Sequence, residues 1–137
     1  MLSAVIPVYN EKESLSAFYT VLIKNIAKVQ KDYEIVFVDD GSSDKSLKIL
    51  KEFESKNNRV KVYSLRKHEG KSEAMTVGFQ KAGGDLIVTL DADLQDRPEE
   101  IIKLIKKQKE GFDLVSGWRK DRKDSFFKVF MSKFFNL

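Results

Sequence analysis

The chain has 137 residues, of which 42% are hydrophobic and 34% charged, a composition that fits one globular domain with a hydrophobic core. It contains no cysteine and one histidine, which excludes a disulfide framework, a thiolate metal site and any site that needs two imidazoles, so oxygen atoms are the metal ligands it offers. The net charge of +4 lies in residues 118–137, which carry 6 basic and 2 acidic side chains against 19 of each in residues 1–117, and this basic end suggests an anionic partner.

Apolar runs and helical patterns alternate along the chain, which indicates strands joined by helical crossovers. The runs AVIP (4–7), EIVFVDD (34–40) and DLIVTLD (85–91) are nearly continuous in apolar and β-branched residues, as in parallel strands covered on both faces. We therefore predict an α/β fold, mainly a parallel sheet with helices on both faces. The predicted elements are strand 2–7, helix 12–30, strand 33–39, helix 44–57, strand 60–65, helix 71–82, strand 85–91, helix 98–110 and strand 113–117.

Capping and breaking residues agree with these boundaries. Asn10 and Ser43 are placed to cap helices, Gly83-Gly84 to end one, and Pro98 to open another at its first turn. No apolar run approaches the roughly 20 residues that a membrane-spanning helix needs, and the first residues are too quickly polar for a signal peptide. We therefore expect a protein that is cytoplasmic or peripheral to a membrane.

The unusual residues of this sequence follow the predicted strands. In an open parallel sheet, ligands bind beyond the carboxyl ends of the strands. The segments found there are PVYNE (7–11), VDDGSSD (38–44), RKHEGK (66–71), DADLQD (91–96) and GWRKDR (117–122). One edge of the sheet is thus expected to collect Tyr9, Asp39, Asp40, Lys71, Asp91, Asp93 and Arg119.

Three familiar sites do not fit this edge. The turn after the first strand lacks the G-x-G-x-x-G of a redox dinucleotide fold, and Leu65 stands where a Walker A loop ending at 70–72 would need a glycine. A phosphoacceptor signalling domain would place its acid pair after the first strand and a lysine at the end of the fifth. Here the pair follows the second strand and the fifth ends at Ser116-Gly117. A site for a nucleotide diphosphate and its metal remains.

Asp91 and Asp93 are spaced i, i+2 after the fourth strand. In extended backbone both side chains would point the same way and could share one hard divalent ion, Mg²⁺ or Mn²⁺. Such an ion offsets the carboxylate repulsion and neutralises charge on a departing diphosphate. An acidic pair at a strand end can also cap a helix or face solvent, and Asp96, just before Arg97-Pro98, is better explained as a helix cap.

Five motifs together are similar to a known family. PVYNE, VDDGSSD, GKSEA (70–74), GGDLIVTLDADLQDRPE (83–99) and GWRKDR resemble, in order and at similar spacing, the family 2 inverting glycosyltransferases of GT-A fold. Within that family the sequence looks most like enzymes that transfer a sugar from a nucleotide donor to a polyprenyl phosphate, the dolichyl-phosphate mannose synthase and bactoprenol glucosyltransferase type. The resemblance runs through essentially the whole chain and implies a UDP-sugar or GDP-mannose donor.

The resemblance also implies roles for single positions, of two kinds. Nucleotide contacts would come from Pro7, Tyr9 and Glu11 beside the base, Asp39 and Asp40 at base and ribose, Lys71 near the diphosphate, and Asp91, Ala92, Asp93 and Gln95 around the metal. Catalytic roles would fall to the metal ligands Asp91 and Asp93 and to Arg119, with Arg119 and Arg122 meeting phosphates of donor or acceptor.

Structural alternatives stay open for several of these residues. Tyr9 could be a core residue, Lys71 a solvated lysine at a helix start, and the run around Arg119 and Arg122 a solvated loop. His68 stands where many relatives of the resembled type have asparagine, and a polar loop residue is the simplest interpretation of it.

The implied reaction is in-line attack on the anomeric carbon with inversion. A polyprenyl phosphate oxygen is already anionic near neutral pH, because the second phosphate pKa is about 6, so no strong general base is required. A polysaccharide or glycan hydroxyl acceptor would need a positioned carboxylate. Relatives of the resembled type are longer, so we expect this chain to be an N-terminal portion, and a nucleotide-binding fragment that is inactive by itself is a further alternative.

The end of the chain, SFFKVFMSKFFNL (125–137), would present a broad apolar face as a helix. Such a face can lie in a membrane interface with its lysines at lipid phosphates, which would place the full-length protein at the cytoplasmic face of a membrane. It can also pack on further chain or promote a homo-oligomer. We accordingly divide the chain into a nucleotide-sugar-binding domain (1–117) and a basic loop with an aromatic helix (118–137), and we expect no nucleic-acid partner.

Overall fold

Strands and helices alternate along residues 1–117, the part of the chain that the computed structural model describes. This alternation confirms the predicted order of the first eight elements, with boundaries that differ by up to three residues. The elements are β1 (Leu2–Val8), α1 (Leu15–Val29), β2 (Tyr33–Asp39), α2 (Ser46–Lys56), β3 (Val60–Ser64), α3 (Lys71–Lys81), β4 (Leu86–Thr89), the 3₁₀ turn η1 (Pro98–Glu100) and α4 (Ile101–Gln108).

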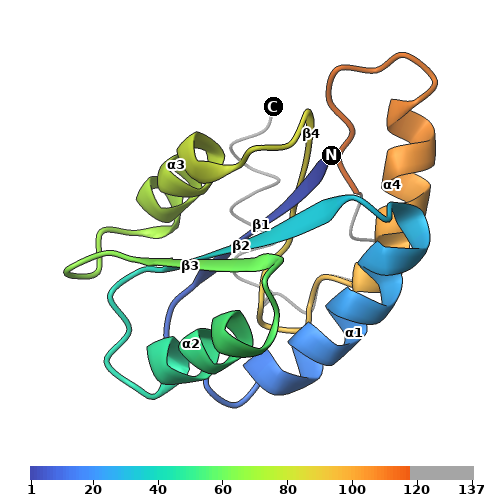
Figure 1. Ribbon diagram of the computed structural model, residues 1–137. Coiled ribbons are helices and arrows are strands. Elements are labelled where there is room, and N and C mark those ends of the chain that lie inside the picture. Colours follow the sequence, from blue (N-terminus) through green and yellow to red (C-terminus); the bar gives the residue numbers. More distant parts are fainter. Residues whose placement is uncertain (118–137) are drawn as a thin grey trace, which may run out of the picture.

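The four strands form one parallel sheet in the order β3-β2-β1-β4 (Figure 1). β1 pairs with β2 along its whole length and with β4 over its first residues, from Leu2–Leu86 to Val5–Thr89. Every residue of β2 is buried, and in β1 only Pro7 is partly exposed. The apolar runs 4–7 and 34–40 therefore belong to central parallel strands, as predicted. The run 85–91 instead forms β4, at the edge of the sheet within the described residues, where Ile87 is 38% exposed.

Helices cover both faces of the sheet. α1, α2 and α4 lie on one side and α3 on the other (Figure 1). Alternate residues of β1 serve the two layers, with Leu2, Ala4, Ile6 and Val8 in the larger core under α1, α2 and α4, and Val5 in the smaller core under α3. α3 lies very close to the sheet, because a Cβ at Gly78 would stand 2.3 Å from Val5 Cγ1.

A buried carboxylate ties the amino end of the sheet together. Glu34 is 4% exposed, and its Oε1 accepts hydrogen bonds from Ser3 Oγ (2.7 Å) and the Gly83 N–H (2.6 Å). Lys61 Nζ lies 2.7 Å from its Oε2. These contacts hold the connection between α3 and β4 against the starts of β1, β2 and β3.

The predicted strand 113–117 is wrong. Residues 112–117 contain no strand, and Leu114 in their middle is 86% exposed. A strand needs a hydrogen-bonding neighbour and a face to bury. Within the described residues this segment has no strand beside it, and β4 stays the edge of the sheet.

Two of the predicted helix boundaries also need correction. Asn10 does not cap α1, which starts at Leu15 after a turn at residues 12–14, and Ser43 does not cap α2, which starts at Ser46. Two other predictions hold: α3 ends at Lys81 with Ala82 as its C-cap, directly before Gly83-Gly84, and Pro98 opens η1. No helix among residues 1–117 is both long and apolar enough to cross a bilayer.

Candidate functional site

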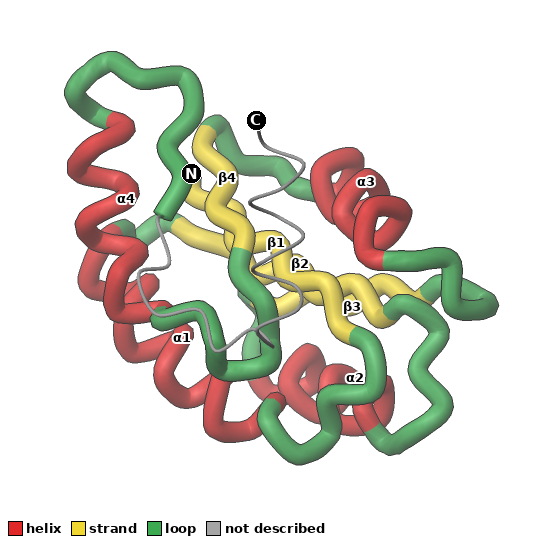
Figure 2. Tube along the Cα trace, turned by 180° about the vertical axis from the view of Figure 1, so that it is seen from behind, coloured by secondary structure: helices red, strands yellow, loops and turns green. Residues whose placement is uncertain are grey.

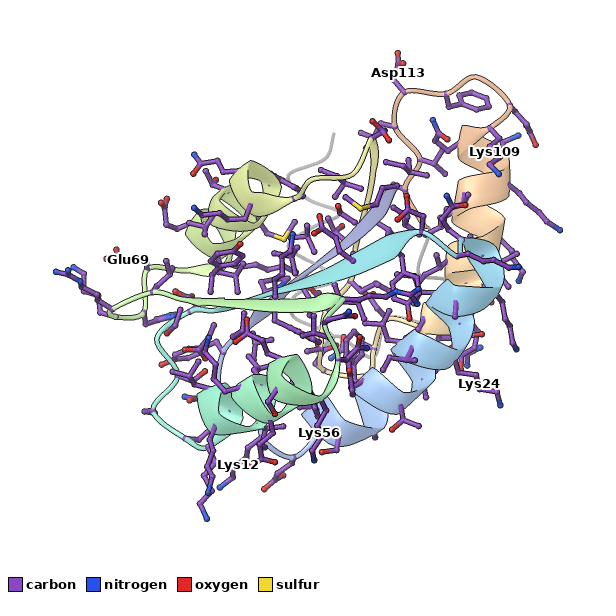
Figure 3. All side chains as sticks on the ribbon, viewed as in Figure 1. Lys12, Lys24, Lys56, Glu69, Lys109 and Asp113 are labelled. Atoms are coloured by element: carbon purple, nitrogen blue, oxygen red, sulfur yellow. The ribbon has the colours of Figure 1, made fainter. Side chains whose placement is uncertain are left out.

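The loops that follow the strands meet at the carboxyl edge of the sheet. β1 is central, with β2 on one side and β4 on the other, so the loops after β1 and β4 lie at the point where the strand order reverses, the usual ligand position in open α/β sheets. Figure 3 places Lys12 and Glu69 in loops at this edge, and Lys109 and Asp113 at the opposite end of the molecule.

Tyr9, His68 and Asp40 connect the first three of these loops. The Asp40 carboxylate is 2% exposed, and His68 Nδ1 lies 2.8 Å from its Oδ2. The imidazole stacks on the Tyr9 ring with the centroids 3.9 Å apart and the planes 20° from parallel. Asp40 also accepts the backbone N–H groups of Glu69 (2.8 Å) and Gly70 (3.0 Å), which fixes the loop between β3 and α3.

Asp39, at the end of β2, has a buried carboxylate whose oxygens are hydrogen-bond acceptors. It is 1% exposed, and its Oδ2 accepts hydrogen bonds from Ser64 Oγ (3.0 Å) and the Ser42 N–H (3.3 Å). Its Oδ1 is buried without a hydrogen-bond partner among residues 1–117. Since such buried polar atoms are rare in folded proteins, this oxygen is a candidate acceptor for a donor that comes from outside those residues.

Asn10 links the loop after β1 to the loop after β2. Its backbone is left-handed (φ 53°), and its Oδ1 accepts the N–H groups of Ser43 (2.9 Å) and Asp44 (3.3 Å). Burial opposes ionisation of Asp44, yet hydrogen bonds from the Ser46 hydroxyl and backbone hold the pKa of Asp44 below its usual value. The amide that was predicted to cap a helix therefore joins two loops instead.

Pro7 and Glu11 flank this link. Pro7 lies inside β1, opposite Val38 of β2, and shapes the strand end rather than the loop. The carboxylate of Glu11 accepts the Ser14 hydroxyl (2.8 Å), at the start of α1. Pro7, Tyr9 and Glu11 were predicted to lie beside the base. Of these three, Tyr9 presents an exposed aromatic ring (42% exposed).

Lys71 and Asp91 connect the loop after β3 to the loop after β4. Lys71 is the first residue of α3, and its Nζ lies 2.5 Å from Asp91 Oδ1. The lysine side chain is 61% exposed and the aspartate 25%. The ammonium group thus occupies one side of the carboxylate that was predicted to bind a metal.

Residues 91–96 form a turn, which corrects the assumption of extended backbone. Leu94 has a left-handed φ of 63°, and Asp93 Oδ1 accepts the Gln95 N–H (3.0 Å). Asp96 does not cap the next helix, because its Oδ2 accepts the Asp91 N–H (2.7 Å). From this turn, with Ala92 buried inside it, the chain passes to η1 on the α1 side of the sheet (Figure 2).

The donor set suits a hard divalent ion that arrives with its substrate. No three His, Cys, Asp or Glu side chains within residues 1–117 are grouped so that they could hold a metal by themselves. The turn after β4 offers two carboxylates, Asp91 and Asp93, and Mg²⁺ commonly binds one or two carboxylates together with substrate phosphates and water. The chemistry of these two side chains therefore fits a hard divalent ion whose remaining ligands come from outside the protein.

The remaining predicted site residues lie outside the described part of the chain. These are Arg119 and Arg122, and with them the aromatic segment 125–137. His68, predicted to be a polar loop residue, does lie in the loop between β3 and α3, with its side chain 52% exposed. Its contacts with Tyr9 and Asp40 were not predicted.

The protein is thus an open α/β sheet with carboxylates and an aromatic ring at its carboxyl edge, the position where proteins of this class bind ligands. The chain belongs to glycosyl transferase family 2, whose family model matches residues 3–136. This membership confirms the family that the five motifs indicated.

Curated relatives carry one recurrent name. The chain is 45% identical to an undecaprenyl-phosphate 4-deoxy-4-formamido-L-arabinose transferase of Proteus mirabilis and 45% identical to one of Edwardsiella ictaluri, in both cases over 136 residues. These alignments cover 98% of this chain and 42% of each relative. The chain thus spans about two fifths of the length of the curated relatives it matches.

Solved structures share the fold. TarS residues 1–349 from S. aureus superpose with a TM-score of 0.62 at 22% identity, covering 90% of this chain and 40% of that one. The mannosyltransferase PcManGT from Pyrobaculum calidifontis, solved with GDP-Man and Mn²⁺, gives a TM-score of 0.62 at 21% identity, covering 77% and 31%. These likenesses confirm the predicted GT-A fold.

Proposed function

We propose that the protein binds a nucleotide-diphosphate sugar at the carboxyl edge of its sheet and transfers the sugar to undecaprenyl or another polyprenyl phosphate, with inversion. Family membership and the name of the 45% identical relatives support the donor class and the acceptor class. One structural observation carries the proposal: the contacts of His68 with Tyr9 and Asp40 and the contact of Lys71 with Asp91 come from one short segment, residues 68–71, which leads from the loop after β3 into α3.

The base and ribose would lie at the Tyr9 end of this edge. Tyr9 offers a flat aromatic face, and stacking on an aromatic ring suits every nucleobase. Asp39 and Asp40 are acceptors for N–H or hydroxyl donors, and Asp39 Oδ1 is buried without a partner among the described residues. Glu11 and Pro7 would border the base from the end of β1.

The diphosphate would lie at the Lys71 end. Asp91 and Asp93, with Gln95 beside them, would hold Mg²⁺ or Mn²⁺, which supplies charge neutralisation for the departing nucleotide diphosphate. Lys71, whose side chain is 61% exposed, is close enough to Asp91 to contact the same phosphates. Ala92 sets the spacing of the two carboxylates within the turn.

The acceptor would approach as an anion. Its phosphate oxygen attacks the anomeric carbon, the bond to the nucleotide diphosphate breaks, and no carboxylate has to remove a proton. Arg119 and Arg122 are proposed to bind the phosphate of acceptor or donor, since a guanidinium forms paired hydrogen bonds to phosphate. A lipid acceptor places this step at a membrane surface, which segment 125–137 is proposed to contact.

Calorimetric titration tests the donor half of the proposal. UDP and GDP are titrated into the 137-residue chain with Mn²⁺ and with EDTA, and we expect one of them to bind only with the metal. Asp93→Asn should weaken the metal-dependent affinity, whereas Asp113→Asn, the same change at the opposite end of the molecule (Figure 3), should leave it unaltered. No binding of either nucleotide, or an equal effect of the two variants, would contradict the proposal.

Turnover tests the acceptor half. Release of nucleotide diphosphate from the donor sugar is followed with and without undecaprenyl phosphate. Stimulation by the lipid supports transfer to a polyprenyl phosphate. Transfer to a glycan hydroxyl without the lipid contradicts it, and metal-dependent binding with no turnover identifies a nucleotide-binding part whose catalysis needs further chain.

A further inference from the structure

His68 makes the two contacts that the proposed function assigns to the base of the donor. Its ring lies against Tyr9 (3.9 Å between centroids), and its Nδ1 meets Asp40 (2.8 Å). A nucleobase in this position would likewise stack on Tyr9 and point a ring N–H, in the plane of the ring, at the carboxylate. The Tyr9 ring and the Asp40 carboxylate can thus bind the imidazole or the base, but not both at once.

The other acceptor positions of Asp40 are already taken. Its Oδ1 accepts the Glu69 N–H (2.8 Å), and the Gly70 N–H bonds to Oδ2 (3.0 Å) and, more weakly, to Oδ1 (3.3 Å). These donors are backbone groups of the same loop, and Asp40 is only 2% exposed. An external donor can therefore reach Asp40 chiefly where the imidazole lies.

The loop does not depend on the imidazole for its shape. The backbone bonds from Glu69 and Gly70 to Asp40 anchor it from one side. The backbone of Gly41 packs closely against the loop. A Cβ at Gly41 would stand 2.4 Å from the Lys67 carbonyl carbon and 2.6 Å from the His68 backbone nitrogen. The His68 side chain itself is 52% exposed. It can rotate away while the backbone keeps its place.

We propose that His68 is a displaceable occupant of the base subsite: its imidazole covers Tyr9 and Asp40 in the absence of nucleotide, and the donor base takes its place. His68 then sets base affinity as a positioning residue. This inference rests on the proposed function, because it presupposes a nucleotide at this edge. The competing arrangement, in which the imidazole stays and the base stacks on its outer face, makes opposite predictions.

Two variants of His68 separate the ring from the hydrogen bond. His68→Asn removes the ring and keeps a short polar side chain, whereas His68→Phe keeps a ring on Tyr9 and cannot bond to Asp40. Since an aromatic pair of this kind stabilises by about 0.5–1.5 kcal/mol, removing it should raise nucleotide affinity about 2- to 10-fold in His68→Asn. His68→Phe should give no gain, and Tyr9→Leu should lose affinity.

Because His68 is the one histidine of the chain, NMR reports on it directly. The imidazole C–H signals of the ¹³C-labelled protein are recorded during titration with Mg²⁺ and the binding nucleotide, with Tyr9→Leu as the unstacked reference. We expect the wild-type signals to move toward that reference. Movement away from it, together with weaker binding by His68→Asn, would overturn the proposal in favour of the base on the outer face.

The outcomes distinguish failure of the displacement proposal from failure of the proposed function. If the wild type binds nucleotide and His68→Asn does not bind more tightly, only the displacement proposal fails. If neither protein binds UDP or GDP with metal, the proposed function fails and takes this inference with it. Binding by His68→Asn alone would support both, because it would show the base subsite blocked by the imidazole. Unchanged urea midpoints of the variants confirm that the fold is intact.

Discussion

Glu34 gives a sharp test of how the fold is held at the end of the sheet away from the site. In Glu34→Ala, Ser3 Oγ and the Gly83 N–H lose their acceptor, and Ser3 is fully buried. A buried donor left without a partner costs about 1–3 kcal/mol. The Lys61 ammonium adds little, since its side chain is 48% exposed and water replaces the carboxylate. We expect a total loss of about 1–3 kcal/mol in the free energy of unfolding.

Urea denaturation followed by circular dichroism at pH 7 measures this loss. Glu110→Ala is the matched control, because Glu110 also pairs with a lysine, Lys107, but both side chains are more than half exposed. The control should change the unfolding free energy by less than about 0.5 kcal/mol. Equal losses in the two variants would refute the argument that the buried Ser3 hydroxyl, and not the ion pair with Lys61, makes Glu34 important for stability.

The pH dependence of stability offers a second measurement on Glu34. Burial opposes its ionisation, but hydrogen bonds from Lys61, the Gly83 N–H and Ser3 hold the pKa of Glu34 below its ordinary value of 4.5. Its charge therefore stabilises the fold above pH 4.5, and this contribution is lost as the pH falls through the lower pKa of the folded state. Glu34→Gln should flatten the acid limb of the stability curve, and an unaltered limb would contradict this.

Three further substitutions test the site and its support. Lys71→Met should raise Mn²⁺ affinity without nucleotide, measured by paramagnetic resonance, because a cation that competes for Asp91 is removed; unchanged affinity would mean that the contact does not form in solution. Gly41→Ala should lower nucleotide affinity in calorimetry, since the added Cβ meets the Lys67 backbone at 2.4 Å and φ is +65°. Gly78→Ala should destabilise by about 1–3 kcal/mol in urea through overlap with Val5, and a smaller loss would show that α3 can shift outward.

Local pattern was enough for the central strands β1 and β2 because they are buried on both faces. The run at 34–40 is typical of such a strand, and Pro98 can open a helix without losing a needed N–H. Strand 113–117 failed because pairing depends on a neighbour, which no run of residues can supply for itself.

The errors at the site have a common physical cause. Asn10 and Asp96 carry the side chains that cap helices, but the same oxygens can accept any nearby backbone N–H, and here those belong to Ser43 and Asp91. The i, i+2 argument for Asp91 and Asp93 required extended backbone, but residues 92 and 93 lie in a turn. The contact of His68 with Tyr9 joins positions 59 residues apart, and no linear motif encodes such a distance.

The segment from His68 to Lys71 has a consequence for how a substrate would be sensed. Its first residue contacts Tyr9 and Asp40, at the proposed base side, and its last contacts Asp91, at the proposed phosphate side. α3, which follows it, packs closely on Val5 through Gly78. Under the proposed function, binding of the base and departure of the nucleotide diphosphate would be coupled through this one segment. We then expect a donor with a different base to show a lower rate of sugar transfer as well as a lower affinity.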